Sequence, residues 1–140
     1  MDITFNTETI RIINLFEKLT GVQIKDCLTD EDSNVIYLIV KEGKVGIAIG
    51  KNGSTIKHVE KLMKRRIKVF EFSNDLATFV KNIIPQSQEV KIKNEVDGIN
   101  VEIKVDRNDK AIIIGRDGRN LKIYKEILQR CHKVNNLTVR

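Results

Sequence analysis

The chain has few cysteines and histidines, and their positions do not favour a metal site. Among 140 residues there are two cysteines, Cys27 and Cys131, and two histidines, His58 and His132. Structural zinc sites need four such ligands at short spacings, and disulfides are typical of oxidising compartments. We therefore expect reduced thiols, no metal ligands and no cofactor.

The chain also lacks a long apolar run. A membrane-spanning helix needs about 20 consecutive, mostly apolar residues, and no run of even about 18 occurs. The first four residues have no basic segment leading into an apolar stretch, as a secretory signal would. These absences predict no membrane partner and a cytoplasmic location.

Aromatic residues and catalytic motifs are scarce as well. Five Phe, two Tyr and no Trp make recognition by aromatic stacking platforms, as in RRM and OB folds, a poor expectation. No Ser–His–Asp, Cys–His or paired-carboxylate arrangement can be assembled. The segment Gly46–Asn52 superficially resembles a nucleotide-binding P-loop, but three residues instead of four separate its glycines, and Asn52 follows the lysine. We expect no enzyme and no catalytic residues.

Positive charge is abundant and unevenly spread along the chain. The formal net charge is +6. Residues 44–72 hold eight basic and two acidic side chains, and residues 107–140 hold nine and three. The stretches before them are acidic: residues 1–43 hold four basic and eight acidic side chains, and residues 74–106 hold four and six. Two separate basic packets favour a polyanionic partner.

The two basic packets contain an internal repeat. A shift of 65 positions sets Ala48-Ile49-Gly50-Lys51-Asn52-Gly53 on Ile113-Ile114-Gly115-Arg116-Asp117-Gly118. Both copies read as two apolar residues, glycine, a basic residue, a short polar residue and glycine, followed by an amphipathic run. The agreement of flanks, spacing and charge favours a duplication.

Hydrophobic periodicity predicts the same order of elements in both halves. In the first half we expect a helix that is capped by Asn6 or Thr7, presents Ile12, Leu15, Phe16 and Leu19 on one face and ends at Gly21. It is followed by strands 22–28 and 35–40, a helix 45–49, a helix capped by Ser54 that runs to about residue 64, and a strand near 67–70. In the second half we expect a helix capped by Asn74 or Asp75 and stopped by Pro85, strands 90–96 and 99–105 joined at Asp97-Gly98, helices 109–114 and 119–131, and a strand 137–139. The fold class is therefore α+β, with domains at 1–73 and 74–140.

Each Gly-x-x-Gly loop has the chemistry of a phosphate-binding turn. Glycine lets the backbone turn sharply and lets a ligand approach the main chain, and the following helix starts with unpaired N–H groups. A basic residue inside each loop and a lysine one turn later add cationic contacts. Ile47 and Ile49, like Ile112 and Ile114, are expected to divide between core and groove wall. A groove with one apolar wall and one cationic edge suits unpaired bases and their phosphates. The candidate nucleic-acid-binding residues are Ile49, Gly50, Lys51, Asn52, Gly53, Ser54, Lys57, Ile114, Gly115, Arg116, Asp117, Gly118, Arg119 and Lys122.

The loops Gly50–Gly53 and Gly115–Gly118, with β-branched residues before them and amphipathic helices after them, resemble the signature loops of KH domains. The order helix-strand-strand-helix-helix-strand resembles the type II variant, a three-stranded sheet with helices on one face. Two such domains with a short joint resemble the family of archaeal NusA-like proteins. KH domains clamp about four unpaired nucleotides at this loop. The resemblance implies a single-stranded RNA-binding factor in transcription elongation, termination or antitermination, with RNA polymerase as a further partner.

Alternatives remain open at several points. Ribosome assembly, RNA processing and a protein-interaction adaptor with little RNA affinity are the rival functions. Asp117 places a carboxylate inside the second loop, where it either repels a phosphate or caps the following helix, so the first loop is the cleaner clamp. The basic run Lys61–Arg66 fits a solvated helix face better than an RNA contact.

Overall fold

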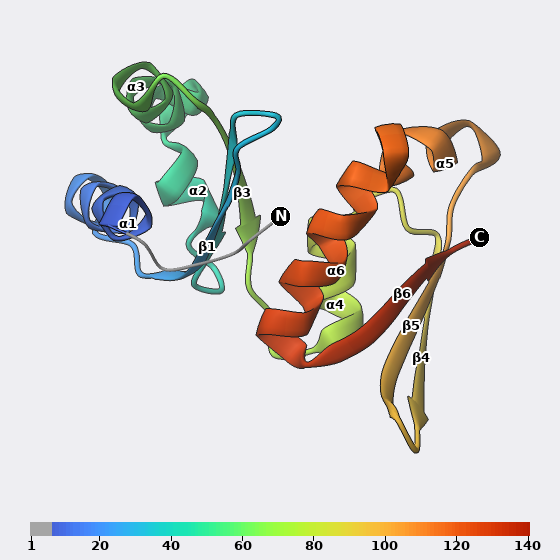
Figure 1. Cartoon of the computed structure of the whole chain (residues 1–140). Helices are drawn as coiled ribbons and strands as arrows, with labels where there is room; N and C mark the ends of the chain where they lie inside the picture. The colour runs from blue at the N-terminus through green and yellow to red at the C-terminus, as the bar shows by residue number, and fades with distance from the viewer. Residues whose placement is uncertain (1–6) are drawn as a thin grey trace. The chain divides into compact units, whose positions relative to one another are not determined.

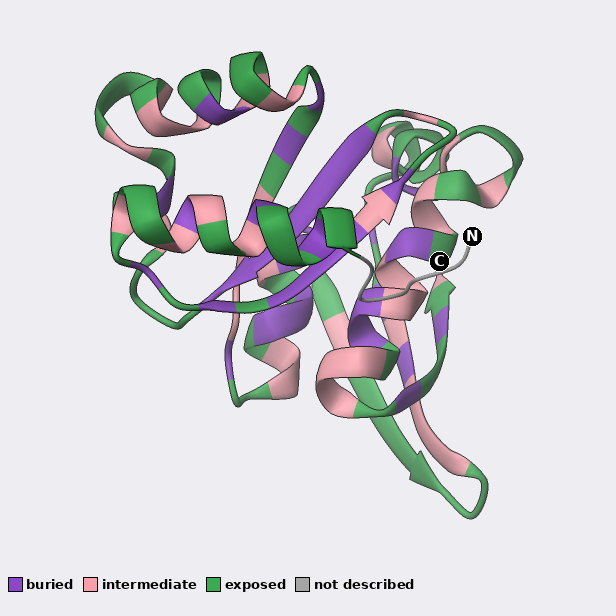
Figure 2. Ribbon diagram, turned by 60° about the vertical axis from the view of Figure 1, so that its left-hand side comes forward, coloured by how far each residue is buried: buried purple, intermediate pink, exposed green. Residues whose placement is uncertain are grey.

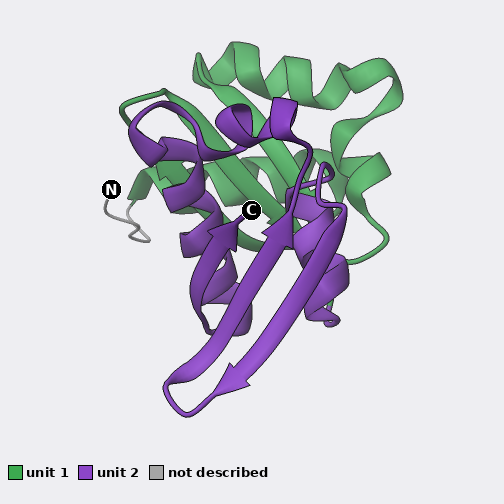
Figure 3. Cartoon of the chain, turned by 90° about the vertical axis from the view of Figure 1, so that its right-hand side faces the viewer, with its two compact units in different colours: residues 1–73 green, residues 74–140 purple. Residues whose placement is uncertain are grey.

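The structure is a computed structural model that describes residues 7–140. The chain divides into two compact units, Met1–Ser73 and Asn74–Arg140, which Figure 3 shows in different colours. Asn6, one of the two predicted caps of the first helix, lies outside the described residues. Each unit is described by itself.

Both units have the same order of elements, shown in Figure 1. The first contains α1 (Thr7–Thr20), β1 (Ile24–Asp30), β2 (Val35–Val40), α2 (Val45–Ile49), the 3-10 turn η1 (Lys51–Gly53), α3 (Ser54–Met63) and β3 (Arg66–Glu71). The second contains α4 (Leu76–Ile83), β4 (Glu89–Glu95), β5 (Gly98–Lys104), α5 (Arg107–Ile114), η2 (Arg116–Gly118), α6 (Arg119–His132) and β6 (Val134–Val139). The helix-strand-strand-helix-helix-strand order and the α+β class predicted from the sequence are present in each unit.

The two sheets have the same topology. In the first, β2 lies between β1, to which it is antiparallel, and β3, to which it is parallel. In the second, β5 lies between antiparallel β4 and parallel β6 in the same way. A parallel pair needs a crossover connection, and here each crossover carries the Gly-x-x-Gly loop and its flanking helices. In the second unit, α4 and α6 lie on one face of the sheet (Figure 1).

The core of the first unit lies between its helices and one face of its sheet. The cluster contains Ile12 and Phe16 of α1, Ala48 of α2 and Val59 of α3. Strand β2 is buried along its whole length, which Figure 2 shows in purple. Leu19, predicted to share the apolar face of α1, is instead 46% exposed. It lies one residue before the end of that helix, where the chain turns away at Gly21 (φ 70°).

The core of the second unit is built in the same way from α4, α6 and β5. Phe79, Val80 and Ile83 of α4 are buried, as are Ile123, Ile127 and Leu128 of α6. The predicted cap Asp75 accepts a hydrogen bond from the amide of Thr78 at 3.0 Å. The last strand begins at Val134, three residues earlier than expected, because parallel pairing with β5 already includes Val134 and the polar residue Asn136, with a register shift between the two pairs.

Two general findings bear on function. Of the helices in residues 7–140, none is long and apolar enough to cross a membrane. Over the same residues, no three histidine, cysteine or acidic side chains come together in a way that could hold a metal ion.

Candidate nucleic-acid interface

The first loop is a tight turn whose backbone requires glycine at its start. Helix α2 ends at Gly50, which adopts φ 80° and ψ 169°, a region that is essentially restricted to glycine. A Cβ atom at Gly50 would lie 2.4 Å from Oγ1 of Thr55 and 2.9 Å from its amide nitrogen. Gly53 adopts φ 73°, and its amide donates to the carbonyl of Gly50 at 3.1 Å. The two glycines therefore fold the chain back so that α3 starts immediately after the turn.

The second loop repeats this backbone within a few degrees. Gly115 adopts φ 77° and ψ 171°, and Gly118 adopts φ 72°. A Cβ atom at Gly115 would lie 2.8 Å from the side-chain amide of Asn120, which also donates to the carbonyl of Ile112 at 3.0 Å. The repeat seen in the sequence is thus a repeat of three-dimensional geometry.

The third position of each loop is left-handed, and this explains its residue type. Asn52 has φ 57° and ψ 28°, and Asp117 has φ 57° and ψ 26°. Asn and Asp enter this region more readily than most residues. The expectation that Asp117 caps the next helix is wrong, because the cap position of α6 is Gly118. Ser54 is likewise the first helical residue of α3, after the cap Gly53, and not the cap itself.

The predicted basic side chains lie on the surface around the loops. Lys51 and Lys57 are exposed in the first unit, and Arg116, Arg119 and Lys122 are exposed in the second. The exposed polar residues Asn52, Ser54 and Asp117 complete the two loops. All predicted polar site residues are therefore accessible to a ligand.

A hollow of about 320 Å³ adjoins the first loop. Its apolar part comes from α2, α3 and β3, and its polar edge from two charged residues of α3. It is lined by Ile49, Gly53, Ile56, Lys57, Glu60, Ile67 and Val69. The apolar wall expected from the sequence is present in this unit, but the charged edge combines one cation, Lys57, with one anion, Glu60.

Glu60 is the groove residue that the sequence analysis missed. Its carboxylate accepts a hydrogen bond from the amide of Ile67 at 2.9 Å and so ties α3 to β3. Because this contact joins a helix to the next strand, no local pattern marks it.

The isoleucines before the loops do not divide between core and groove as expected. The buried residues are the ones between them, Ala48 in α2 and Ile113 in α5. Ile47 is 54% exposed, and Ile112 is 68% exposed. Ile49 lines the groove. The expectation fails because α2 and α5 turn one residue of each Ile-x-Ile segment inward, and that residue is the middle one.

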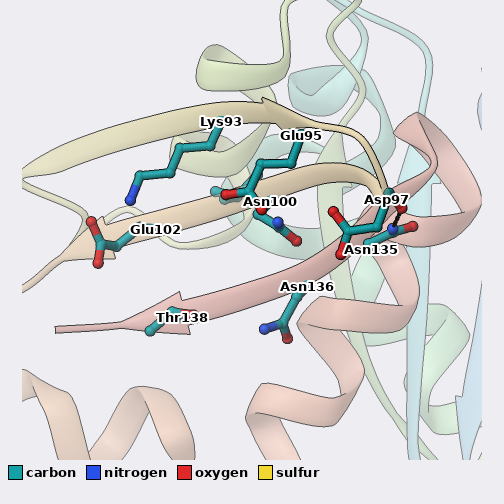
Figure 4. A pocket seen from close by; sticks show the side chains of 9 residues that line it. Lys93, Glu95, Asp97, Asn100, Glu102, Asn135, Asn136 and Thr138 are labelled. Carbon is teal, nitrogen blue, oxygen red and sulfur yellow. Dashed lines mark hydrogen bonds between the residues drawn. The ribbon is translucent and has the colours of Figure 1, made fainter.

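A separate hollow of about 450 Å³ lies on the sheet of the second unit, and Figure 4 shows the side chains that line it. Its lining residues come from all three strands, and Asn135 donates to the carbonyl of Asp97. Three carboxylates and one lysine lie here, together with amides and a threonine: Lys93, Glu95, Asp97, Asn100, Val101, Glu102, Asn135, Asn136 and Thr138. This excess of negative charge disfavours phosphate, so the loops remain the candidate interface.

Comparisons with known proteins agree with this geometry. The sequence pattern of the KH domain family matches residues 10–92, from α1 to β4, and so includes the first loop. A protein named "Probable transcription termination protein NusA" from Methanococcus vannielii is 36% identical over 99% of this chain and 80% of its own length. A protein of the same name from Thermoplasma acidophilum is 33% identical over 99% of this chain and 96% of its own length.

A solved structure agrees as well. The crystal structure of APE1850 matches with a TM-score of 0.79 and 33% identity, covering 97% of this chain and 100% of that one. The family pattern spans more than half of the chain, and the relatives span nearly all of it. The chain therefore belongs to the KH domain family and, within it, to the NusA-like proteins.

Proposed function

We propose that the chain is a non-enzymatic factor that binds single-stranded RNA through two tandem type II KH domains, residues 1–73 and 74–140. The observation that carries this proposal is the duplicated loop, in which both copies share one backbone conformation and exposed basic residues. In each unit the sheet order and the parallel last strand support the type II assignment.

Single-stranded RNA fits the first groove better than a duplex does. The hollow beside the loop is lined by Ile49, Ile56, Ile67 and Val69, which suit an unstacked base, while Lys57 lies at its edge. An A-form duplex hides its bases and offers mainly phosphate and 2′-hydroxyl groups. Each KH domain holds about four nucleotides, so the two loops together take about eight.

The names of the relatives support a role in transcription termination. Within this role we propose nascent RNA as the ligand, RNA polymerase as a second partner and the cytoplasm as the location. Recovery of crosslinked RNA from cells tests this role. Enrichment of nascent transcripts is the expected result, and enrichment of ribosomal RNA precursors alone would favour ribosome assembly.

The clamp itself is tested by Lys51→Asp combined with Asn52→Asp. Asp adopts the same left-handed conformation at position 117, so the backbone of the first loop can persist. We expect affinity for a short unpaired RNA to fall by at least about tenfold, because two negative charges then face the phosphates.

The matched control is Asn14→Asp with Lys18→Asp, which makes the same charge change on exposed positions of α1. Circular dichroism shows whether both variants stay folded. Equal RNA binding by the loop variant and the parent protein would disprove the clamp. Retained polymerase binding without RNA affinity in the parent would favour an adaptor.

A further inference from the structure

A second hollow of the first unit lies at the far end of α3, away from the loop. It measures about 380 Å³ and is lined by Asn34, Glu60, Lys61, Lys64, Arg65 and Arg66. Four of these six residues are basic and one is acidic. They come from the turn between β1 and β2, the end of α3 and the start of β3.

Hydrogen bonds hold the walls of this hollow in place. Lys64 ends α3 in the left-handed conformation (φ 55°), and its carbonyl accepts from the side-chain amide of Asn34 at 3.1 Å. The carbonyl of Asn34 accepts from the amide of Arg66 at 3.2 Å. The amide of Arg65 donates to the carbonyl of Glu60 at 3.3 Å. The carbonyl oxygens of Asn34, Glu60 and Lys64 therefore already accept hydrogen bonds from uncharged amide groups.

The basic residues of this hollow have two different roles. Arg65 is buried, with Nη1 2.5 Å from Glu8 and Nη2 3.3 Å from Glu31, so its charge is used inside the unit. Lys61, Lys64 and Arg66 are exposed, and none of them forms an ion pair with another described residue. Three cationic side chains therefore remain available to an anionic ligand at one site.

This site continues the groove that starts at the loop. Glu60 lines both hollows, and its carboxylate is held by the amide of Ile67. Helix α3 has 10 residues, so about 15 Å of helix separates the loop from this end. An RNA strand that is held at the Gly50–Gly53 loop and runs along α3 would reach Lys61, Lys64 and Arg66.

The second unit differs from the first at this position. Helix α6 ends in the same way, with Lys133 at φ 56°, but the next two residues are Val134 and Asn135, where the first unit has Arg65 and Arg66. Arg66, one of the three exposed cations of the first unit, therefore has no basic counterpart in the second unit.

We propose that Lys61, Lys64 and Arg66 form a second phosphate-binding site, which takes the backbone of the same RNA strand after it leaves the Gly50–Gly53 loop. The inference rests on the proposed function. It assigns to the first unit a longer RNA track than the four nucleotides of the loop and groove.

The test compares two double variants. One carries Lys61→Glu and Arg66→Glu, and the control carries Arg11→Glu and Lys18→Glu. Both pairs are exposed, belong to the first unit and change the net charge by the same amount. Both are measured in the full chain with Arg116→Asp and Lys122→Asp added, which reduces binding at the second loop. The probes are unpaired RNAs of about four and about eight nucleotides.

We expect the Lys61/Arg66 variant to bind the shorter RNA like the control and the longer RNA about tenfold more weakly than the control. Its slope of log affinity against log salt for the longer RNA should fall by about 1.4, the value for two lost phosphate contacts. Equal affinities and slopes for this variant and the control on the longer RNA would overturn the second site. If Lys51→Asp with Asn52→Asp also leaves binding unchanged, the proposed function itself fails.

Discussion

At the scale of single residues, the two glycines of each loop have different constraints. A side chain at Gly50 would meet Thr55 at 2.4 Å, whereas a Cβ atom at Gly53 has only Lys57 Cε, at 3.8 Å, nearby. Gly50 also has a backbone conformation that is essentially restricted to glycine, whereas Gly53 is in the ordinary left-handed region.

These constraints predict an order of stability among alanine variants. Gly50→Ala should lower the free energy of unfolding of the first unit by about 3 kcal/mol or more, because strain and a steric clash combine. Gly53→Ala should cost about 1 kcal/mol, the strain of a left-handed alanine. Denaturant unfolding measures both, and an equal or reversed order would contradict the loop geometry.

Because Asp117 places a carboxylate in the second loop, we predict that a substitution there can raise the affinity of this loop for RNA. Asp117→Asn keeps a residue suited to φ 57°, as Asn52 shows in the first loop, and removes a negative charge. We expect RNA affinity to rise about twofold to fivefold, since one like charge near a phosphate costs up to about 1 kcal/mol in water. Titration of labelled unpaired RNA checks this, and unchanged affinity would mean that the second loop does not contact phosphate.

At the scale of elements, the start of α4 depends on one titrating cap. The side chain and the amide of Thr78 both donate to Asp75, and these hydrogen bonds lower the pKa of that carboxyl. Because the folded pKa lies below the unfolded one, the ionised cap stabilises the second unit at neutral pH. This stabilisation is lost as the pH falls through the folded pKa.

The control for this prediction is Asp75→Asn, since asparagine also caps helices but does not titrate. The parent protein should have the higher melting temperature at neutral pH, and the difference should shrink below about pH 4. A difference that stays constant from pH 7 to pH 2 would show that the ionised form of Asp75 contributes no stability.

Arg65 links three elements of the first unit and predicts a stability effect without an RNA effect. Its guanidinium contacts Glu8 of α1 and Glu31 of the turn between β1 and β2. Arg65→Gln should lower stability by about 2 kcal/mol, less than for a fully buried pair because both glutamates are partly exposed. RNA affinity at a temperature where the variant is folded should not change. A large loss of affinity would make Arg65 a ligand contact.

The sequence predicted the elements well because their signals are local. The amphipathic period of α1, the Asp97-Gly98 turn and the cap at Asp75 depend on near neighbours. The turn and the cap are confirmed, and the period of α1 is confirmed except at Leu19. Features that depend on distant residues were missed. The burial of Arg65 needs Glu8, 57 positions away, and the early start of β6 at Val134 needs its parallel partner β5.

In short helices, hydrophobic periodicity did not predict which residue is buried. Helix α2 has five residues, too few for a period of 3.6 to distinguish Ile47, Ala48 and Ile49. The glycine positions and the loop ends were predictable because glycine has a conformational role that no other residue fills. That is also why the candidate RNA-binding residues could be named from sequence, although their contact with RNA stays a prediction.

At the scale of the whole molecule, the charge packets and the loops belong together. Residues 44–72 and 107–140 hold most of the positive charge and also hold the two Gly-x-x-Gly turns with their following helices. Each unit thus presents a Gly-x-x-Gly turn among basic residues, and if the turns bind phosphate as proposed, RNA affinity should fall as the salt concentration rises.

The central claim is that both loops bind unpaired RNA, and amide chemical shifts measured during an RNA titration test it most directly. The account predicts that a single-stranded RNA of about eight nucleotides shifts the amides of Gly50–Gly53 and Gly115–Gly118 most strongly, together with those of the groove beside the first loop. Large shifts confined to the polar sheet face of the second unit, with both loops unchanged, would contradict it.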